Sequence, residues 1–138
     1  MKEKSNPLVI VEKEEEATLI SLNDEGSFNS LSENLLKELF IAFKEADEDS
    51  STKVLVLKGV GRGFSAGHNL KEVQENENES FYRELLNCCK EVMTFLPNLN
   101  KPVIAEVHGV ATAAGCQLVA SCDLAYADTN TRFATPGV

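Results

Sequence analysis

The chain has 138 residues, of which 43% are hydrophobic, and this matches one globular domain or part of one rather than a disordered or collagen-like chain. With 13 Lys and Arg against 22 Asp and Glu, the net charge of −9 argues against general binding to nucleic acid or to an anionic membrane. The sequence also lacks an apolar run of roughly 18 residues, the length that a membrane-spanning helix needs.

The first half of the chain alternates between strand and helix patterns. Two apolar, β-branched runs, at 8–13 and 17–22, flank an acidic turn and predict a β-hairpin. From Ser32 onward the apolar residues recur with helical spacing, which predicts an amphipathic helix. We expect its cap to be Ser30 with Glu33, or Ser32 alone, and its end to lie in the acidic residues 45–49. The apolar run 54–57 predicts a buried strand that leads into a glycine-rich loop at 59–67.

The second half continues this alternation. Residues 72–79 are polar and acidic and predict a mobile surface segment, after which Ser80 is expected to cap a second amphipathic helix closed by Pro97. A strand is predicted at 103–107, a small-residue turn at 109–115, a short apolar helix from about 114 to 122, and a strand at 124–127. This order predicts an α/β fold that stops before an element closes the sheet.

Two small-residue segments are candidates for ligand binding. Gly61-Arg-Gly-Phe-Ser-Ala66 matches the dinucleotide-binding pattern G-x-G-x-x-G/A, but a helix must begin there, and Gly67 and Asn69 are poor helix residues. A tight loop is the alternative. The second segment, Ala113-Ala-Gly-Cys116, opens a helix, where free N–H groups favour an oxygen that carries negative charge. Tight helix packing is the alternative there, and the two uses are compatible.

The motifs in these segments resemble those of the enoyl-CoA hydratase/isomerase (crotonase) family. Phe64-Ser-Ala-Gly-His-Asn-Leu70 is similar to its F-[SA]-[AS]-G-x-[DN]-[LI] loop, and residues 101–118 are similar to K-P-V-I-A-x-V-x-G-x-A-x-G-G-G-x-x-L. Asn29-Ser-Leu-Ser32 resembles N-A-L-S, and residues 121–137 continue the match in order. The versions F-S-A-G-H-N-L and A-T-A-A-G-C-Q-L look most like the enoyl-CoA hydratase domain-containing protein 3 branch.

The resemblance implies a crotonase-like spiral of ββα units, truncated before the C-terminal helices, with residues 1–138 as the N-terminal part of an acyl-CoA-binding domain. In the family, two backbone N–H groups hold the thioester oxygen, and by position these belong to His68 and Ala114. The rest of the coenzyme A thioester, as substrate or ligand, would contact Ala66, Gly67, His68, Asn69, Leu70 and Lys71. We expect no other cofactor and no metal, and a homo-oligomer, a trimer or dimer of trimers, for a full-length protein.

The sequence departs from the family at three places. Hydratases of the family use two glutamates on the added water, and those positions are Gln117 and Gly137 here. An amide is no general base near pH 7, and glycine has no side chain. Many relatives also carry a basic residue before N-A-L, where this chain has Phe28, so recognition of the nucleotide end is expected to be weaker or different. Lys71 is either a phosphate partner or a solvated charge at a helix start.

Two readings of the function follow. The chain is either an acyl-CoA-directed enzyme of the lyase or isomerase type without ordinary hydratase activity, or a catalytically inactive acyl-CoA-binding or oligomerising protein. Other polar candidates have structural interpretations: an ion pair for Glu106 in a buried strand, a turn role for His108, and a helix–strand tether for Asp123. The His68 side chain is expected to reach either the acyl chain or solvent.

The cysteines and the acidic N-terminus bear on the compartment. Cysteines at 88, 89, 116 and 122 match no common zinc spacing, and Cys116 and Cys122 are expected in the core. Residues 1–16 are acidic and lack arginine, unlike a mitochondrial transit peptide. We therefore expect a reduced, cytoplasmic protein.

Overall fold

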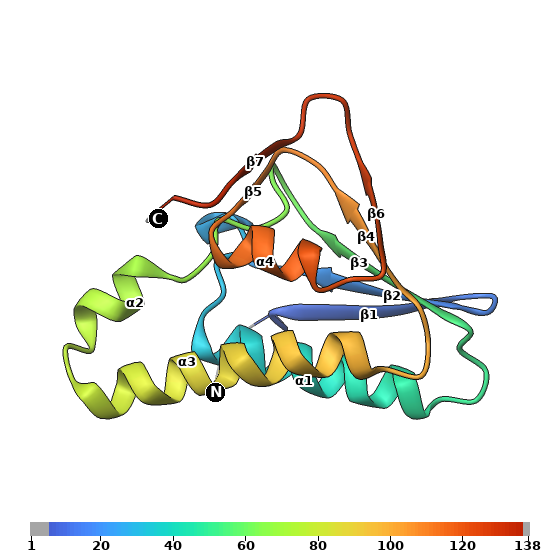
Figure 1. The fold of residues 1–138 in the computed structure, drawn as a ribbon, viewed down its shortest axis with the longest axis horizontal. Coiled ribbons are helices and arrows are strands. Elements are labelled where there is room, and N and C mark those ends of the chain that lie inside the picture. The colour runs from blue at the N-terminus through green and yellow to red at the C-terminus, as the bar shows by residue number, and fades with distance from the viewer. Residues whose placement is uncertain (1–5, 137–138) are drawn as a thin grey trace.

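A five-stranded sheet forms the centre of the structure, a computed structural model that describes residues 6–136. The strands lie in the order β1 (Val9–Glu14), β2 (Ala17–Leu22), β3 (Val54–Gly59), β4 (Val103–Val107) and β6 (Leu124–Ala127) (Figure 1). β1 and β2 are antiparallel and form the predicted hairpin. The pairs β2–β3, β3–β4 and β4–β6 are parallel, and such pairs need the crossover connections that the helices supply. The predicted α/β class is confirmed.

Two long helices, α1 (Glu33–Glu48) and α3 (Glu79–Phe95), run side by side beneath the hairpin (Figure 1). The Ser32 hydroxyl accepts a hydrogen bond from the Leu35 N–H at 3.2 Å, so Ser32 is the cap of α1. Of the two predicted caps, Ser30 with Glu33 or Ser32 alone, the second is confirmed. α3 begins one residue before Ser80. Its cap is Asn78, whose side chain accepts from the Phe81 N–H at 2.8 Å, which corrects the prediction of a Ser80 cap.

Several short elements were not predicted. The polar segment after Leu70 starts with a helix, α2 (Leu70–Glu75), because the Asn69 side chain accepts from the Glu72 N–H at 3.1 Å and caps it. Single 3-10 turns occupy Glu25–Ser27 and Leu96–Asn98. The small-residue turn contains β5 (Val110–Thr112), which pairs in parallel with β7 (Arg132–Ala134) as a second sheet. α4 (Ala114–Ala120) follows β5, and it confirms the short apolar helix that was predicted from about 114 to 122.

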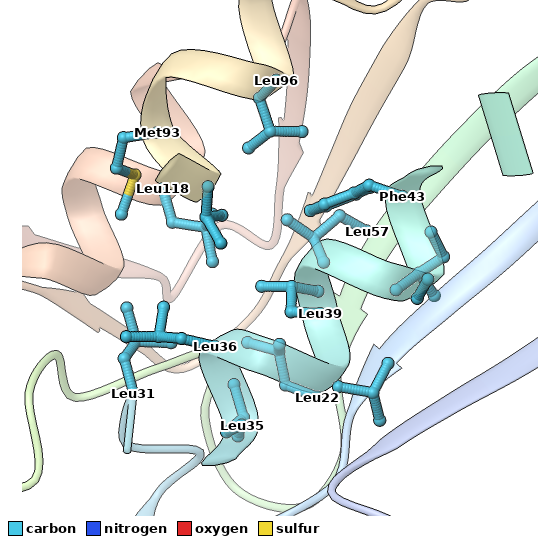
Figure 2. Close-up of a cluster of buried hydrophobic side chains, with 14 of the residues drawn as sticks. Leu22, Leu31, Leu35, Leu36, Leu39, Phe43, Leu57, Met93, Leu96 and Leu118 are labelled. Carbon is cyan, nitrogen blue, oxygen red and sulfur yellow. The ribbon is translucent and has the colours of Figure 1, made fainter. Parts of the chain in front are cut away.

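The core lies where the five-stranded sheet meets α1, α3 and α4 (Figure 2). Leu22 and Leu57 extend from the sheet toward Leu36 and Leu39 of α1, and Leu118 of α4 packs into the same cluster. Each of these five side chains is fully buried, so α1 and α4 are anchored to the sheet. Among residues 6–136, none of the helices has the length and apolar character needed to cross a membrane.

The acidic end of α1 is stabilised from outside the helix. The Lys101 ammonium donates hydrogen bonds to the carbonyls of Ala46, at 2.8 Å, and Asp49, which offsets the unfavourable acids at this end of the helix dipole. Hydrogen bonds from the Ser51 N–H and the Thr52 hydroxyl hold the pKa of Asp49 well below its usual range. The loop after α1 is therefore tied to the start of β4.

The topology brings three connections to one edge of the sheet. β2, β3 and β4 are parallel neighbours, so their carboxyl ends meet at the same edge. The segments that leave these ends are 23–32, 60–69 and 108–113. Both candidate ligand-binding segments of the sequence therefore lie at this edge, together with the segment that leads into α1.

Candidate functional site

The glycine-rich loop after β3 and the segment before α4 lie side by side. The Ser65 N–H donates to the Val110 carbonyl, and the Ser65 carbonyl accepts from the Thr112 N–H, both at 3.0 Å. Two residues further on, a Cβ added to Gly67 would lie 3.0 Å from the Ala113 Cβ and 3.2 Å from the Ala114 nitrogen. Residues that are far apart in the sequence are thus brought into contact just before the two predicted donors, His68 and Ala114.

Each predicted donor follows a residue with positive φ. Gly67 has φ +90°, and Ala113 has φ 51° and ψ −124°. The first conformation is ordinary for glycine, but the second is strained for alanine and costs about 1–3 kcal/mol. In both cases the unusual backbone conformation comes immediately before the residue that carries the predicted donor.

The N–H groups of His68 and Ala114 have no hydrogen-bond acceptor among residues 6–136. Their neighbours do: the Gly67 N–H donates to the Ser65 hydroxyl at 3.3 Å, and the Ala113 N–H donates to the Ala134 carbonyl at 2.8 Å. Ala114 is only 8% exposed, so its free donor lies in a largely dehydrated place. A backbone donor of this kind requires an acceptor.

A buried hydrogen-bond network fixes the loop that carries His68. The Ser65 hydroxyl donates to the Asn29 carbonyl at 2.8 Å, and the Asn29 side-chain amide donates to the carbonyls of Val60, at 2.8 Å, and Gly63, at 3.0 Å. Ser65 and Asn29 are fully buried. Neither residue was identified as functional from the sequence, because their partners are more than 30 residues distant.

The residues predicted to contact coenzyme A divide into an inner and an outer group. Gly67 is buried and His68 half-buried, and the His68 Nδ1 atom is itself buried with no partner among residues 6–136. Ala66 is exposed in the loop, Asn69 is half-buried as the cap of α2, and Leu70 and Lys71 are exposed at the start of that helix. The Lys71 ammonium lies 3.8 Å from the Glu75 carboxylate, an arrangement that favours the solvated-charge interpretation of Lys71.

Of the two positions that carry glutamate in family hydratases, the structure describes one. Gln117 lies in α4, three residues after Ala114, and is exposed at the surface. Its amide offers no general base. Gly137 lies outside the described residues. No helix begins between Gly61 and Ala66, so the dinucleotide-binding alternative is wrong for this loop.

The remaining polar candidates have structural roles. The Glu106 side chain is 62% exposed and lies 3.9 Å from the Lys58 ammonium, so the expected ion pair is present, and of the two expected positions, buried or facing a neighbour, the second is observed. The His108 Nε2 atom is 2.6 Å from the Gly61 carbonyl and holds two turns together, as predicted. The Asp123 carboxylate accepts from the Val103 N–H at 2.7 Å and tethers the end of α4 to β4, as predicted.

The four cysteines are free thiols. Cys88 and Cys89 are buried in α3, whereas Cys116 and Cys122 are partly buried rather than fully in the core. Burial raises the pKa of the Cys122 thiol to about 12, so this sulfur is protonated at neutral pH. A protonated thiol is a poor nucleophile, which leaves Cys122 as a packing residue.

Comparison with known proteins gives the same family from sequence and from structure. Residues 12–138 match the Enoyl-CoA hydratase/isomerase family. Enoyl-CoA hydratase domain-containing protein 3, mitochondrial, of Xenopus laevis is 42% identical over 132 residues, which cover 96% of this chain and 45% of that protein. The crystal structure of a Mycobacterium smegmatis enoyl-CoA hydratase has a TM-score of 0.89 at 44% identity, covering 93% of this chain and 50% of that one. Human enoyl-CoA hydratase domain-containing protein 3 has a TM-score of 0.90 at 38% identity, with coverages of 94% and 51%.

These likenesses confirm the resemblance to that branch of the family and the crotonase-like fold. The chain spans about half the length of the curated relatives it matches. The prediction of a cytoplasmic protein is wrong, because the similar proteins of Xenopus laevis, Danio rerio, Mus musculus and Homo sapiens are named as mitochondrial. Unpaired cysteines indicate reducing conditions rather than one particular compartment, so they were a poor guide to location.

Proposed function

The chain belongs to the enoyl-CoA hydratase/isomerase family, and from this we propose that it binds an acyl-CoA thioester in a backbone oxyanion hole. The thioester oxygen accepts hydrogen bonds from the N–H groups of His68 and Ala114. One observation carries the proposal. Neither N–H group has a hydrogen-bond acceptor within residues 6–136, and the residues that precede them, Gly67 and Ala113, are in contact.

The chemistry of a thioester explains why two such donors matter. When a proton leaves the carbon next to the carbonyl, or a nucleophile adds to the conjugated double bond, negative charge develops on the carbonyl oxygen. Donors that are already in place stabilise that charge more than they stabilise the neutral carbonyl, and this difference lowers the barrier. The buried Ser65–Asn29 network supports the proposal, because it holds the His68 loop in one conformation.

The remainder of the ligand lies along Ala66, Gly67, His68, Asn69, Leu70 and Lys71 in this proposal. Gly67 has no side chain, so the ligand can approach the backbone closely there. The exposed Leu70 side chain offers an apolar contact to the pantetheine arm. The thioester is the ligand or substrate, and the proposed chemistry uses no further cofactor.

Family members are usually enoyl-CoA hydratases or isomerases, which makes an enzyme the coarse assignment. For this chain we propose stabilisation of an enolate without ordinary hydration, because Gln117 stands where a hydratase carries a glutamate. A second function, a catalytically silent acyl-CoA-binding protein, is favoured by the same observation. Turnover with crotonyl-CoA separates the two.

We also propose that residues 1–138 form the N-terminal part of an acyl-CoA-binding domain and that a full-length protein with this domain is a homo-oligomer, a trimer or a dimer of trimers. Leu124, Tyr126 and Phe133 expose apolar surface that the rest of such a domain, or a second copy, covers. Light scattering at several concentrations tests the assembly, and a monomer at every concentration contradicts it.

The binding proposal is tested by calorimetric titration with three ligands: butyryl-CoA, its thioether analogue S-butyl-CoA, and free coenzyme A. The thioether keeps the chain and the nucleotide but lacks the carbonyl oxygen. Two neutral hydrogen bonds contribute about 1–3 kcal/mol together, so the thioester should bind roughly 5- to 150-fold more tightly than the thioether. Equal affinities for these two ligands would remove the oxyanion hole from the proposal.

A further inference from the structure

We propose that the free edge of β1, together with the hollow between β1 and α1, binds an extended segment of a partner protein in which apolar and basic side chains alternate. The segment adds a strand to the five-stranded sheet beside β1. Glu14 of β1 pairs with Ala17, the first residue of β2, so this surface lies at the amino end of β2 (Figure 1). The loops of His68 and Ala114 lie beyond the carboxyl ends of the strands, so the surface is separate from the candidate functional site.

The edge of β1 is unpaired in its second half. Among residues 6–136, β1 pairs only with β2. The N–H groups of Leu8 and Val9 donate to the Glu38 carboxylate at 2.8 and 3.1 Å, so the Val9 N–H points away from β2. Main-chain groups alternate in direction along an antiparallel strand, and those of Val11 and Lys13 therefore point outward as well. No acceptor for these two N–H groups lies among the described residues, which leaves them open to another strand.

An apolar hollow lies beside this part of the edge. It has a volume of about 360 Å³, and Val11, Ala42 and Ala46 form its apolar lining. A smaller hollow of about 190 Å³ continues it past Ile41 and shares Val11 and Ala42 with it. Val11 and Ile41 are 51% and 54% exposed, so an apolar side chain that enters the hollow removes apolar surface from water.

Carboxylates surround the hollow. Glu45 lines it from α1, and Glu12 and Glu14 lie on β1 beside it. Among residues 6–136, no cation lies within 4.0 Å of these three carboxylates. Lys13, which lines the same hollow, is already paired with Asp49 at 3.0 Å. A segment that binds here therefore gains from positive charge.

The side-chain pattern of β1 defines the order of the partner's residues. Val11 pairs with the fully buried Ile20, so its side chain lies on the core side of the sheet, where the hollow is. Glu12 and Glu14 lie on the opposite face, because side chains alternate along a strand. A paired segment with alternating apolar and basic residues places the first in the hollow and the second beside Glu12 and Glu14. A second copy of this chain fits poorly, since it carries a net charge of −9 and would bring the same glutamates to the same edge.

The experiment measures the fluorescence anisotropy of a labelled heptapeptide, lysine alternating with valine or leucine, that is titrated with the 138-residue chain. Three control peptides carry glutamate in place of lysine, N-methyl groups on the lysines, or N-methyl groups on the apolar residues. We expect the lysine peptide to bind and the glutamate peptide to bind at least about tenfold more weakly. Only alternate N–H groups of a strand face its neighbour, so one of the two N-methylated peptides should lose binding while the other retains it.

Three variants of the chain locate the bound peptide. Val11→Pro removes one outward N–H and should weaken binding by about 2- to 10-fold. The double variant Glu12→Gln with Glu14→Gln should weaken it by a similar factor, and the difference should shrink in about 0.5 M salt. The control, Glu77→Gln in the exposed segment between α2 and α3, should change the affinity by less than about twofold.

The proposal fails if the lysine peptide does not bind, or if it binds no more tightly than the glutamate peptide. It also fails if both N-methylated peptides bind as the parent peptide does, a result that decides the matter even where Val11→Pro does not fold. Sedimentation of the chain with and without the lysine peptide tests the other occupant. A dimer that the peptide dissociates would assign the edge to a second copy, whereas an unchanged oligomeric state supports a separate partner.

Discussion

The side-chain hydroxyl of Ser65 donates a hydrogen bond to the main-chain carbonyl of Asn29 at 2.8 Å and links two loops that are 36 residues apart in the sequence. The same hydroxyl accepts from the Gly67 N–H at 3.3 Å. One buried oxygen therefore connects the segment before α1 to the peptide next to His68. The alignment of the proposed thioester donors depends on this link.

Replacement of Ser65 by Ala should affect both stability and recognition. The change leaves buried polar groups of Asn29 and Gly67 without a partner, which lowers the free energy of unfolding by about 1–3 kcal/mol. The affinity ratio between butyryl-CoA and S-butyl-CoA should fall as well, because the His68 N–H is no longer held. Urea unfolding and calorimetry measure the two effects. A loss of stability with an unchanged ratio would show that Ser65 is structural only.

Ala113 should tolerate glycine better than alanine. Its φ of 51° and ψ of −124° are strained for alanine, and relief of about 1–3 kcal/mol exceeds the extra chain entropy of glycine, about 0.5–1 kcal/mol. We expect Ala113→Gly to raise the free energy of unfolding by about 1 kcal/mol. The control, Ala120→Gly at the exposed end of α4, should lower it slightly. A lower urea midpoint for Ala113→Gly would refute the strain at this residue.

The lowered pKa of Asp49 predicts that the free energy of unfolding falls in acid. Its pKa is lowered in the folded state by hydrogen bonds from the Ser51 N–H and the Thr52 hydroxyl, so the carboxylate stabilises the fold above the unfolded pKa of about 3.9. That contribution is lost as the pH falls below this value. Asp49→Asn should therefore be less stable than the wild-type chain at pH 7, with a difference that shrinks between about pH 5 and pH 2. A difference that is constant with pH in urea unfolding would contradict the assignment.

Hydration of crotonyl-CoA should be slow. Gln117 replaces a carboxylate, and general acid–base help usually contributes about 10²–10⁴-fold, so we expect a turnover far below about 10 s⁻¹, the median for enzymes. Gln117→Glu should introduce measurable hydration, followed as loss of the absorbance of the conjugated thioester. Turnover of the unaltered chain near the enzyme median would show that other residues activate water.

If Gln117→Glu shows no hydration, the carboxylate missing at Gly137 is one explanation, and two further proteins test it. The first is the double variant Gln117→Glu with Gly137→Glu. The second is the same double variant extended by the C-terminal half of a relative. Intact acyl-CoA binding without activity in the extended protein would mean that these two positions are misassigned.

The elements with strong periodicity were predictable from the sequence, and the short ones were not. The apolar spacing of α1 and the continuous apolar run of β3 reflect burial against the core, so the pattern and the structure agree. β5 and β7 have three residues each, and they pair through contacts between distant segments that no local pattern encodes. α2 depends on a single cap, Asn69, which was interpreted as a poor helix residue and as a ligand contact, but not as a helix cap.

The site was predictable only in part for the same reason. The motifs marked the loops of His68 and Ala114, and the topology brings these loops together. The sequence did not indicate which residues hold the loops. A Cβ on Gly115 would lie 2.4 Å from the Ser65 carbonyl oxygen, so this close approach requires glycine, yet no local pattern connects the two positions. Whether Glu106 is buried or faces a neighbour was left open, because an apolar strand does not reveal which of its faces is exposed.

The central claim, that the N–H groups of His68 and Ala114 hold the thioester oxygen, is tested most directly by infrared difference spectroscopy of butyryl-CoA with a ¹³C-labelled thioester carbonyl. Two hydrogen bonds polarise the carbonyl, so its stretching band should move to lower frequency when the ligand binds, relative to the band in water. The shift should decrease in Ser65→Ala, where the His68 loop is released. A bound ligand with the carbonyl frequency of the free thioester would contradict the account.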